Sequence, residues 1–302
     1  MGFELSGKLV IGVSSRALFD LSYENEIFEK EGVEAFSRYQ LEHENDILKP
    51  GPGFSLIQAL LHINTLPGQE GRVEVIVMSR NSADTSLRVF HSIHAYGLNI
   101  TRAVLAGGSS LAPYLSAFQT DLFLSADEGD VQKAIDSGIA AGIIYSDGIH
   151  TYDCSGEHDC IRIAFDGDAV LFSDESEKIY QEKGLEAFED NERAQASNPM
   201  AEGPFAAFLK TISQLQREFP PCQSPIRTAL VTSRSAPAHE RVIRTLRAWN
   251  VRIDEAFFLG GISKKDVLKA FGAQIFFDDQ SVHTKAAQEV VPTARVPYRN
   301  TT

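Results

Sequence analysis

Short runs of hydrophobic residues recur along the chain and alternate with longer amphipathic or charged stretches. In the stretch Glu240–Trp249 the apolar residues have helical spacing. Short apolar runs that alternate with helices are typical of a parallel β-sheet covered on both faces. The pattern therefore predicts an α/β fold with doubly wound, Rossmann-like sheets, in which ligands bind beyond the carboxyl ends of the strands. The expected strands are Leu9–Val13, Val73–Met78, Leu122–Leu124, Ile161–Phe165, Thr228–Thr232 and Ile275–Phe277.

The two halves of the sequence resemble each other at a nearly constant offset. The segment Asn25–Phe36 resembles Glu177–Phe188, with Gly32 and Gly184 152 residues apart. A steady offset over the whole length predicts two tandem homologous units, residues 1–150 and 151–302, that meet in the region of residues 145–160. Further matches at offsets of 152 to 154 residues are Gly51-Pro52 with Gly203-Pro204, Ser79-Arg80 with Ser233-Arg234, and Gly107-Gly108 with Gly260-Gly261.

Acidic and hydroxyl residues follow the hydrophobic runs of the second half. Asp166 and Asp168 follow the first run, Thr232 ends the second, and the pair Asp278-Asp279 follows the last. Parallel strands present the residues after their carboxyl ends at one edge of the sheet. Because Lys264 precedes the last run, the sequence predicts one crevice that holds several carboxylates and a cation.

These motifs carry a family resemblance. An Asp-x-Asp-x-Val sequence after a strand, a Thr after the next, a Lys and a paired acid resemble the signature of haloacid dehalogenase-type phosphatases. The segments Phe165–Glu177, Val231–Ala236 and Phe276–Asp279 are similar to the cytosolic 5′-nucleotidase type I family, and so are Val13–Arg16, Ile47–Pro52 and Leu124–Asp127. The resemblance implies Mg²⁺-dependent hydrolysis of nucleoside 5′-monophosphates, with AMP the usual substrate.

The residue types suit phosphoryl transfer. Asp166 can attack phosphorus and form an aspartyl-phosphate. Asp168 can protonate the leaving oxygen and later deprotonate the hydrolytic water. Thr232 and Lys264 can hold phosphate oxygens, although the adjacent Lys265 is an alternative to Lys264.

Several carboxylates in one crevice repel one another unless a cation lies between them. At about 4 Å and an effective dielectric constant near 20, one like-charged pair costs roughly 4 kcal/mol. Oxygen ligands suit Mg²⁺. We expect Asp166, the backbone carbonyl of Asp168, and Asp279 to bind the metal, with Asp278 as a direct or a water-mediated ligand.

The first half lacks these carboxylates. Ser14 stands in the place of Asp166 and Arg16 in that of Asp168, so this half is expected to be a degenerate, non-catalytic unit. Two interpretations are open for it. It completes the wall of the active site by packing, or Ser14, Ser15, Arg16, Ser79 and Arg80 form an anion pocket for the distal part of the substrate or for a regulatory nucleotide. Ser233 and Arg234 are candidates for substrate or effector contacts in the second half.

The second half also contains an insertion, at about residues 173–225, which the resemblance implies is a small helical cap. Phe172 and Phe19 are candidates for stacking on a nucleotide base. His239 and His283 lie near motifs but are expected to be surface or core residues. The cysteines at positions 154 and 160 flank a His, yet their spacing matches no common zinc site, and a polar connecting loop is the preferred interpretation.

Composition narrows the function classes. With 41 acidic and 28 basic residues the net charge is −13, which disfavours binding of nucleic acids. The absence of an apolar run of membrane-spanning length and of a signal-peptide pattern predicts a soluble, cytoplasmic protein. A phosphatase of another small phosphomonoester and a non-catalytic nucleotide sensor are the alternative functions. A nucleotide effector and assembly into a homo-oligomer are open.

Overall fold

The computed structural model describes residues 4–145, 160–220 and 223–300. The chain divides into two compact units, Met1–Cys154 and Ser155–Thr302. The predicted loop from Cys154 to Cys160, with its alternative interpretation as a zinc site, lies outside the described residues except for Cys160.

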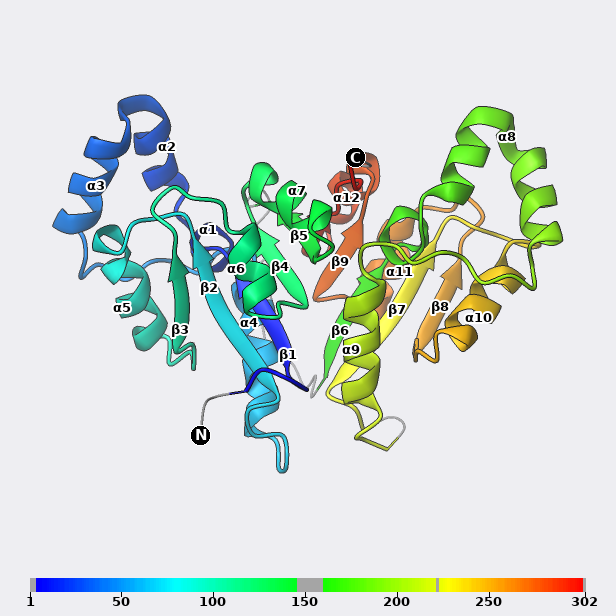
Figure 1. Cartoon of the computed structure of the whole chain (residues 1–302), viewed down its shortest axis with the longest axis horizontal. Coiled ribbons are helices and arrows are strands. Elements are labelled where there is room, and N and C mark those ends of the chain that lie inside the picture. The colour runs from blue at the N-terminus through cyan, green and yellow to red at the C-terminus, as the bar shows by residue number, and fades with distance from the viewer. Residues whose placement is uncertain (1–3, 146–159, 221–222, 301–302) are drawn as a thin grey trace. The chain divides into compact units, whose positions relative to one another are not determined.

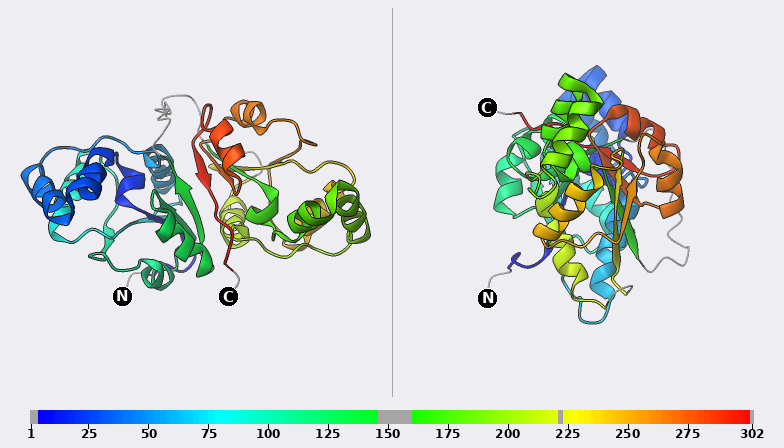
Figure 2. Two further views of the ribbon diagram at one scale, coloured as in Figure 1. Left: turned by 90° about the horizontal axis from the view of Figure 1, so that it is seen from above. Right: turned by 90° about the vertical axis from the view of Figure 1, so that its right-hand side faces the viewer.

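The N-terminal unit is built around a parallel five-stranded sheet with the strand order β3-β2-β1-β4-β5. Helices lie on both faces of this sheet (Figures 1 and 2). The elements are β1 (Leu9–Val13), α1 (Ser15–Leu18), α2 (Ser22–Glu31), α3 (Val33–Glu42), α4 (Phe54–His62), η1 (Ile63–Thr65), β2 (Val73–Ser79), η2 (Asp84–Ser86), α5 (Leu87–Ala95), β3 (Arg102–Leu105), α6 (Ala112–Ala117), β4 (Leu122–Ser125), α7 (Glu128–Asp136) and β5 (Ala140–Ile144).

The C-terminal unit contains a second parallel five-stranded sheet, with the strand order β10-β9-β6-β7-β8. Numbered from its own first strand, this order is the same as in the N-terminal unit. Its elements are β6 (Ile161–Phe165), η3 (Gly167–Leu171), α8 (Glu175–Ala194), α9 (Ala206–Gln216), β7 (Ile226–Thr232), α10 (His239–Ala248), β8 (Glu255–Phe258), α11 (Lys264–Phe271), β9 (Ile275–Asp278), α12 (Ser281–Ala287) and β10 (Thr293–Arg295).

The hydrophobic runs of the sequence form the central strands. All residues of β1 are buried, and β2, β4, β6, β7 and β9 are buried at nearly every position. Strands covered by helices on both faces have no solvated side, so their sequences are continuously apolar rather than alternating. The predicted α/β fold with parallel strands is therefore confirmed.

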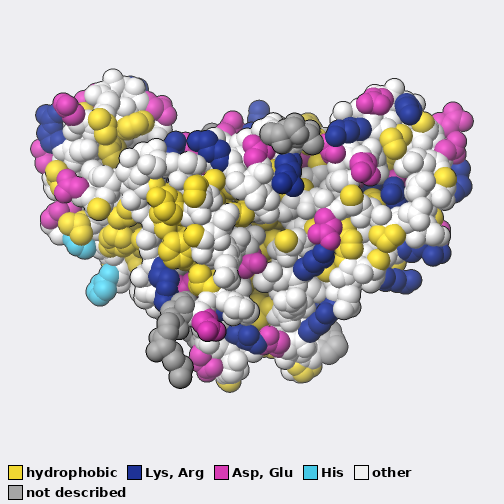
Figure 3. Space-filling model, viewed as in Figure 1, with side chains coloured by type: hydrophobic (Ala, Val, Ile, Leu, Met, Phe, Trp, Pro, Cys, Tyr) yellow, Lys and Arg dark blue, Asp and Glu magenta, His cyan; other side chains and the backbone are white. Residues whose placement is uncertain are grey.

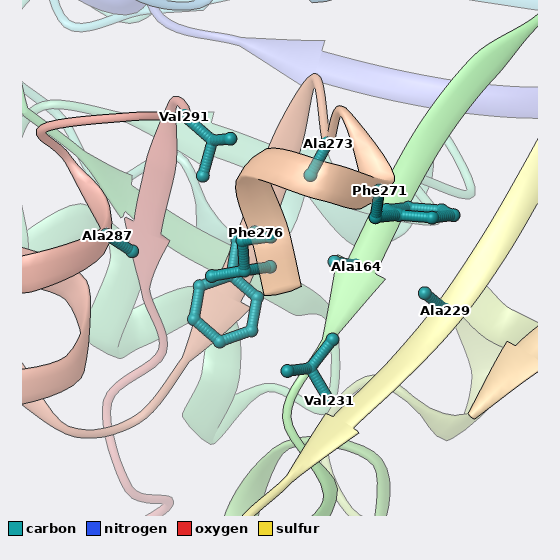
Figure 4. Packing of buried hydrophobic residues seen from close by; sticks show 9 residues of the cluster. Ala164, Ala229, Val231, Phe271, Ala273, Phe276, Ala287 and Val291 are labelled. Atoms are coloured by element: carbon teal, nitrogen blue, oxygen red, sulfur yellow. The ribbon is translucent and has the colours of Figure 1, made fainter. Parts of the chain in front are cut away.

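The core of the C-terminal unit packs helices against one face of its sheet (Figure 4). Small residues on the strands, Ala164 and Ala229, leave room for the larger Phe271 and Phe276. Phe271 belongs to α11, and Ala287 at the end of α12 joins the same cluster. This packing fixes the start of α11, which carries Lys264, relative to the ends of β6 and β9.

A helix pair projects beyond the carboxyl ends of the strands in each unit: α2 with α3, and the two parts of α8 (Figure 1). Gly32 separates α2 from α3 with φ 86°, and Gly184 bends α8 with φ 81°. Only glycine adopts such a conformation without strain. The resemblance between Asn25–Phe36 and Glu177–Phe188 thus corresponds to a helix-glycine-helix element in each unit.

The chain that returns from each helix pair crosses close to the loop after the first strand. A Cβ atom on Gly203 would lie 2.4 Å from the backbone oxygen of Phe172, and one on Gly51 would lie 2.7 Å from the backbone carbon of Phe19. Gly203 N–H donates to the Leu171 carbonyl at 2.9 Å. The two Gly-Pro pairs of the sequence therefore mark crossings that no larger residue fits.

Acidic and basic side chains are interspersed over the visible surface (Figure 3). Across residues 4–145, 160–220 and 223–300, none of the helices combines the length and the apolar character that crossing a bilayer requires.

Candidate active site

The first element of the site is the sharp turn that follows β6. Asp166 is the residue after the strand, and its side chain is 8% exposed. Its backbone N–H donates to the carbonyl of Phe277 in β9 at 2.8 Å, which extends the ladder between β6 and β9 by one residue. The carboxylate of Asp166 is thereby held at the carboxyl end of the sheet.

Lys264, the first residue of α11, lies between two of the predicted carboxylates. Its Nζ is 2.8 Å from Asp166 Oδ1 and 2.6 Å from Asp278 Oδ2. Lys265 instead forms an ion pair with Glu289. Although burial acts against the charged amine, the carboxylates of Asp166 and Asp278 raise the pKa of Lys264 above its usual range. Lys264 is thus a buried, fully charged cation at the centre of the cluster.

The paired acids after β9 have different surroundings. Asp278 is fully buried, and both of its oxygens accept hydrogen bonds: Oδ1 from the Gln280 N–H at 2.8 Å, and Oδ2 from Lys264. The His283 ring lies 3.2 Å from the same Oδ2. Asp279 Oδ2 accepts from the Tyr298 hydroxyl. The other oxygen, Asp279 Oδ1, is buried and has no hydrogen-bond partner among the described residues.

Burial and mutual repulsion disfavour charge on two of these acids. Burial raises the pKa of Asp166 well above its usual range, and Asp278 and Asp279 raise it further against the opposing effect of Lys264. Burial likewise raises the pKa of Asp279 to about 6. For Asp278 the hydrogen bond from His283 and the charge of Lys264 outweigh burial and lower the pKa. Negative charge on Asp166 and Asp279 is therefore disfavoured unless a further cation lies beside them.

The cluster fits a hard divalent cation. Asp166, Asp278 and Asp279 each offer a carboxylate oxygen, and these atoms lie within 4.8 Å of one another. The unpartnered Oδ1 of Asp279 is a buried acceptor that lacks a positive or donating neighbour, which is costly unless a ligand supplies one. Since both oxygens of Asp278 are occupied, Asp279 has the freer ligand atom.

Thr232 is the last residue of β7 and lies beside the turn that follows Asp166. It is 1% exposed, and its Oγ1 accepts from the backbone N–H of Arg234 at 3.2 Å. A Cβ on Gly167 would lie 3.3 Å from this oxygen, so the absence of a side chain at position 167 lets the two loops approach. Ser233, the next residue, is exposed.

Asp168 is held by Arg234 rather than by the acid cluster. The Arg234 Nε and Nη2 donate to the two oxygens of Asp168 at 2.8 and 2.6 Å. Such a bidentate pair fixes both the position and the rotation of a carboxylate. The third nitrogen, Nη1, donates to Glu192 in α8. A direct contact between Arg234 and a substrate stays a prediction, and the geometry indicates that this arginine orients Asp168.

Glu192 completes a buried network that joins α8 to the site. It is fully buried, and Ser176 Oγ and Arg241 Nη1 each donate to its Oε1 at 2.8 Å. Although burial opposes ionisation, Arg234, Ser176 and Arg241 together outweigh it and lower the pKa of Glu192. Nothing in the sequence distinguishes Glu192, because α8 contains many other acidic residues. Tyr298 was missed too, since it follows the last motif in an unpatterned segment.

The candidates of the first half lie together in the N-terminal unit. Ser14 follows β1 and caps α1, Arg16 lies in α1, and Ser79 ends β2, where its hydroxyl is 3.3 Å from that of Ser15. Arg80 forms ion pairs with Asp127 and Asp130. All of these candidate residues line one pocket of this unit.

The structure corrects one alignment between the two halves. The sequence match paired Ser79-Arg80 with Ser233-Arg234. In the structure Ser79 and Thr232 are the last residues of β2 and β7, and each hydroxyl accepts from the N–H two residues later. Ser79 thus corresponds to Thr232, and Asn81 to Arg234. A shared Ser-Arg dipeptide concealed a shift of one residue.

The two aromatic candidates for base stacking are wrong. Phe19 and Phe172 are fully buried, Phe19 against Phe54 and Tyr96 and Phe172 against Trp249. They follow the turns after β1 and β6 and anchor those turns in the core. A ring without exposed surface cannot stack on a ligand.

Comparisons with known proteins identify the family of the chain. The family model described as 5′-nucleotidase matches residues 1–302. The chain is 40% identical over 292 residues to human "Cytosolic 5′-nucleotidase 1B", covering 93% of this chain and 47% of that protein. It therefore spans about half the length of this curated relative.

Two solved structures show only weak similarity. A chain of the Pnkp1/Rnl/Hen1 complex matches with a TM-score of 0.35 and 12% identity over 99% of both chains. Histidinol dehydrogenase from Elizabethkingia anophelis matches with a TM-score of 0.21 and 9% identity, covering 91% of this chain and 73% of that one. At these TM-scores, neither match supports a conclusion about the fold. The match of the family model over the whole length, together with the identity to the human protein, confirms the resemblance noted in the sequence: this chain belongs to the 5′-nucleotidase family.

Proposed function

We propose that this chain is a Mg²⁺-dependent 5′-nucleotidase that hydrolyses nucleoside 5′-monophosphates, AMP foremost, to the nucleoside and phosphate. The observation that carries the proposal is the buried contact of Lys264 with Asp166 and Asp278 beside an Asp279 oxygen without a partner. A cluster of this kind suits one phosphate group and one divalent cation. Asp166, Asp279, the backbone carbonyl of Asp168 and, more weakly, Asp278 would hold Mg²⁺, which supplies positive charge to the phosphate oxygens.

In the first step Asp166 acts as the nucleophile. One of its carboxylate oxygens attacks phosphorus, the bond from phosphorus to the 5′ oxygen breaks, and an aspartyl-phosphate forms. Lys264 and Thr232 donate hydrogen bonds to the transferred phosphoryl oxygens. Asp168, once protonated, gives its proton to the leaving 5′ oxygen.

In the second step Asp168 acts as the base. It takes a proton from the water that attacks phosphorus, and the bond from phosphorus to Asp166 breaks to release phosphate. Asp168 must point towards the reacting oxygen in both steps, and its two hydrogen bonds with Arg234 give it a fixed orientation. Arg234 is therefore a positioning residue in this mechanism.

We also propose that the two units arose by duplication, which their matching strand orders support. In addition, we propose that α8 with its flanking segments serves as a cap over the acid cluster. The human relative is named a cytosolic 5′-nucleotidase, which supports action in the cytoplasm.

A phosphate-release assay over a panel of monophosphates tests the function. Purine and pyrimidine nucleoside 5′-monophosphates, 3′-monophosphates and sugar phosphates would be compared with Mg²⁺ and with EDTA. We expect release from the 5′-monophosphates, highest for AMP, and background rates in EDTA. A preference for sugar phosphates would identify another phosphomonoesterase, and no release from any compound would favour a nucleotide sensor.

The stabilisation of the protein by Mg²⁺ is expected to depend on pH. Asp166 and Asp279 have raised pKa values in the folded chain, about 6 for Asp279. Without metal, the folded state thus binds more protons than the unfolded state, and stability falls as pH rises through this range. Mg²⁺ replaces those protons, so we expect it to raise Tm more at about pH 7.5 than at about pH 5.

Thermal melts with Mg²⁺ and with EDTA at the two pH values provide the measurement. Asp279→Asn should remove most of the Mg²⁺ effect, whereas Asp190→Asn on the exposed surface of α8 should retain it. An equal rise in Tm at both pH values would contradict the assignment of these acids to the metal.

A further inference from the structure

The N-terminal unit contains a pocket of its own, with a volume of about 600 Å³. It lies at the carboxyl ends of β1, β2 and β4, where Ser14, Ser79 and Ser125 line it. Crevices at this edge of a parallel sheet are the usual place for ligands, and the volume suits a small organic molecule. The helix pair α2–α3 forms another side of the pocket.

At the positions that correspond to the acid cluster, the pocket lacks the carboxylates of the C-terminal unit. Ser14 N–H donates to the Leu124 carbonyl just as Asp166 N–H donates to Phe277, so Ser14 occupies the position of the nucleophile candidate. Ser125, the last residue of β4, and Ala126 after it stand in the place of Asp278 and Asp279. Within the described residues, the one cluster of carboxylates that could hold a metal ion lies in the C-terminal unit.

A cation and several hydroxyls are available to an anion in this pocket. Arg16 lines it and, within the described part of the chain, its guanidinium has no hydrogen-bond or ion-pair partner. Ser14, Ser15 and Ser79 are buried beside it, and their hydroxyls can donate to a phosphate oxygen. Arg80 contributes a second cation, which is shared with Asp127 and Asp130. An unpaired arginine next to hydroxyl groups is a typical phosphate site.

Another part of the pocket offers an acceptor rather than donors. Asp130 is 5% exposed, and its Oδ1 has no hydrogen-bond partner among the described residues. The other oxygen, Oδ2, lies 3.2 Å from Arg80 Nε. A buried acceptor without a donor is costly, so a ligand hydroxyl or amino group would be favoured there. A fully ionised phosphate group offers acceptors but no donor. The ligand should therefore carry a hydroxyl or amino group in addition to its phosphate.

The wall formed by α2 and α3 is apolar. Phe28 and Val33 line the pocket while 49% and 62% exposed, and Phe36 meets the Phe28 ring edge to face at 6.0 Å. Figure 3 shows hydrophobic side chains exposed on the lobe of these helices. Exposed aromatic rings beside a polar pocket suit a flat, weakly polar ring system.

We propose that this pocket binds a phosphorylated nucleoside-like molecule intact and without a divalent metal. Its phosphate contacts Arg16 and the serine hydroxyls, a hydroxyl or amino group donates to Asp130, and its ring lies against Phe28 and Phe36. The site is separate from the hydrolytic one and does not depend on the proposed hydrolysis.

Isothermal titration of the full chain with AMP in EDTA tests the proposal. We expect saturable binding that Arg16→Ala weakens at least about 10-fold, equivalent to roughly 1.4 kcal/mol, and that Arg16→Lys partly restores. Arg72→Ala is the matched control, because Arg72 precedes β2 at the opposite end of that strand and does not line the pocket. A thermal melt of each variant shows that it is folded.

Two further variants locate the site and its ligand chemistry. Phe28→Ala, which removes an exposed ring, should weaken AMP binding but leave the binding of inorganic phosphate unchanged. Lys264→Gln in the acid cluster should leave the binding of AMP in EDTA unchanged. If Lys264→Gln abolishes binding and Arg16→Ala does not, the ligand sits in the acid cluster and the proposal is overturned. Absence of AMP binding tighter than about 1 mM in EDTA would overturn it as well.

Discussion

Replacement of Asp166 by asparagine is expected to lower turnover on the order of 10⁶-fold, as for the loss of a covalent nucleophile in other hydrolases. An amide has nearly the same shape as a carboxylate but does not attack phosphorus. The fold should survive, because Lys264 keeps its contact with Asp278 at 2.6 Å and is not left as an unpaired buried charge. The backbone hydrogen bond from position 166 to Phe277 is also independent of the side chain.

The measurement is the steady-state rate of phosphate release from AMP with Mg²⁺, together with a thermal melt. Asp190→Asn is the matched control, because Asp190 is exposed on α8 and pairs with the exposed Arg193. More than about a tenth of the original rate in Asp166→Asn would show that another group attacks phosphorus.

Truncation of Glu192 to alanine is expected to destabilise the C-terminal unit by about 3–5 kcal/mol. Glu192 is fully buried and pairs with Arg234 and Arg241. Without it Arg241 loses its ion-pair partner while still buried, and Arg234 keeps only Asp168. A buried charge without a partner costs far more than the pair contributes, so removal of one member has a large effect.

The same substitution should also affect catalysis in a particular way. With Glu192 absent, Arg234 is less firmly placed and Asp168 loses its fixed orientation. If Arg234 positions Asp168, kcat falls while KM changes little. If Arg234 instead contacts the substrate, KM rises as well.

Equilibrium urea unfolding and steady-state kinetics supply these data. Glu186→Ala is the control: Glu186 is exposed on the same helix, and surface substitutions of this kind change stability by about 0.5 kcal/mol or less. Glu192→Gln should lie between the two, since an amide keeps one acceptor oxygen for Ser176 and Arg241 but loses the charge and the acceptor that faces Arg234. A loss below about 1 kcal/mol for Glu192→Ala would contradict a structural role for the network.

The strands at the centre of each sheet could be predicted because a strand that is buried on both faces is a continuous run of apolar residues in the sequence. Leu9–Val13 and Ile161–Phe165 have the same bounds in sequence and structure. Four strands were not predicted: β3, β5, β8 and β10, which lie at the ends of the two five-strand orders. β3 and β8 have four residues each and are only partly buried, β10 has three residues, and β5, although buried, begins with the weakly apolar sequence Ala-Ala-Gly.

The acid cluster could be predicted from the sequence because its residues directly follow strands. The surroundings of each residue could not, since they depend on contacts between distant segments. Glu192 reaches Arg234 from 42 positions away, and Tyr298 reaches Asp279 from 19. The same reason accounts for Phe19 and Phe172, whose proximity to motifs suggested ligand contacts although tertiary packing turns both rings inward.

The close crossing at Gly203 constrains how α8 can move. Phe172 and Glu202 form an antiparallel bridge, and Ser173 N–H donates to the Ala201 carbonyl at 2.9 Å. The segment that leaves the sheet and the segment that returns are thus clamped together at the base of the helical excursion. Rotation of α8 against the sheet would therefore involve the backbone between residues 173 and 201. Side-chain contacts link α8 to the site beyond this clamp: Glu192 reaches Asp168 through Arg234, and the Phe188 ring lies 5.2 Å from the Arg234 guanidinium. Displacement of the helix would therefore be transmitted to the carboxylate of Asp168.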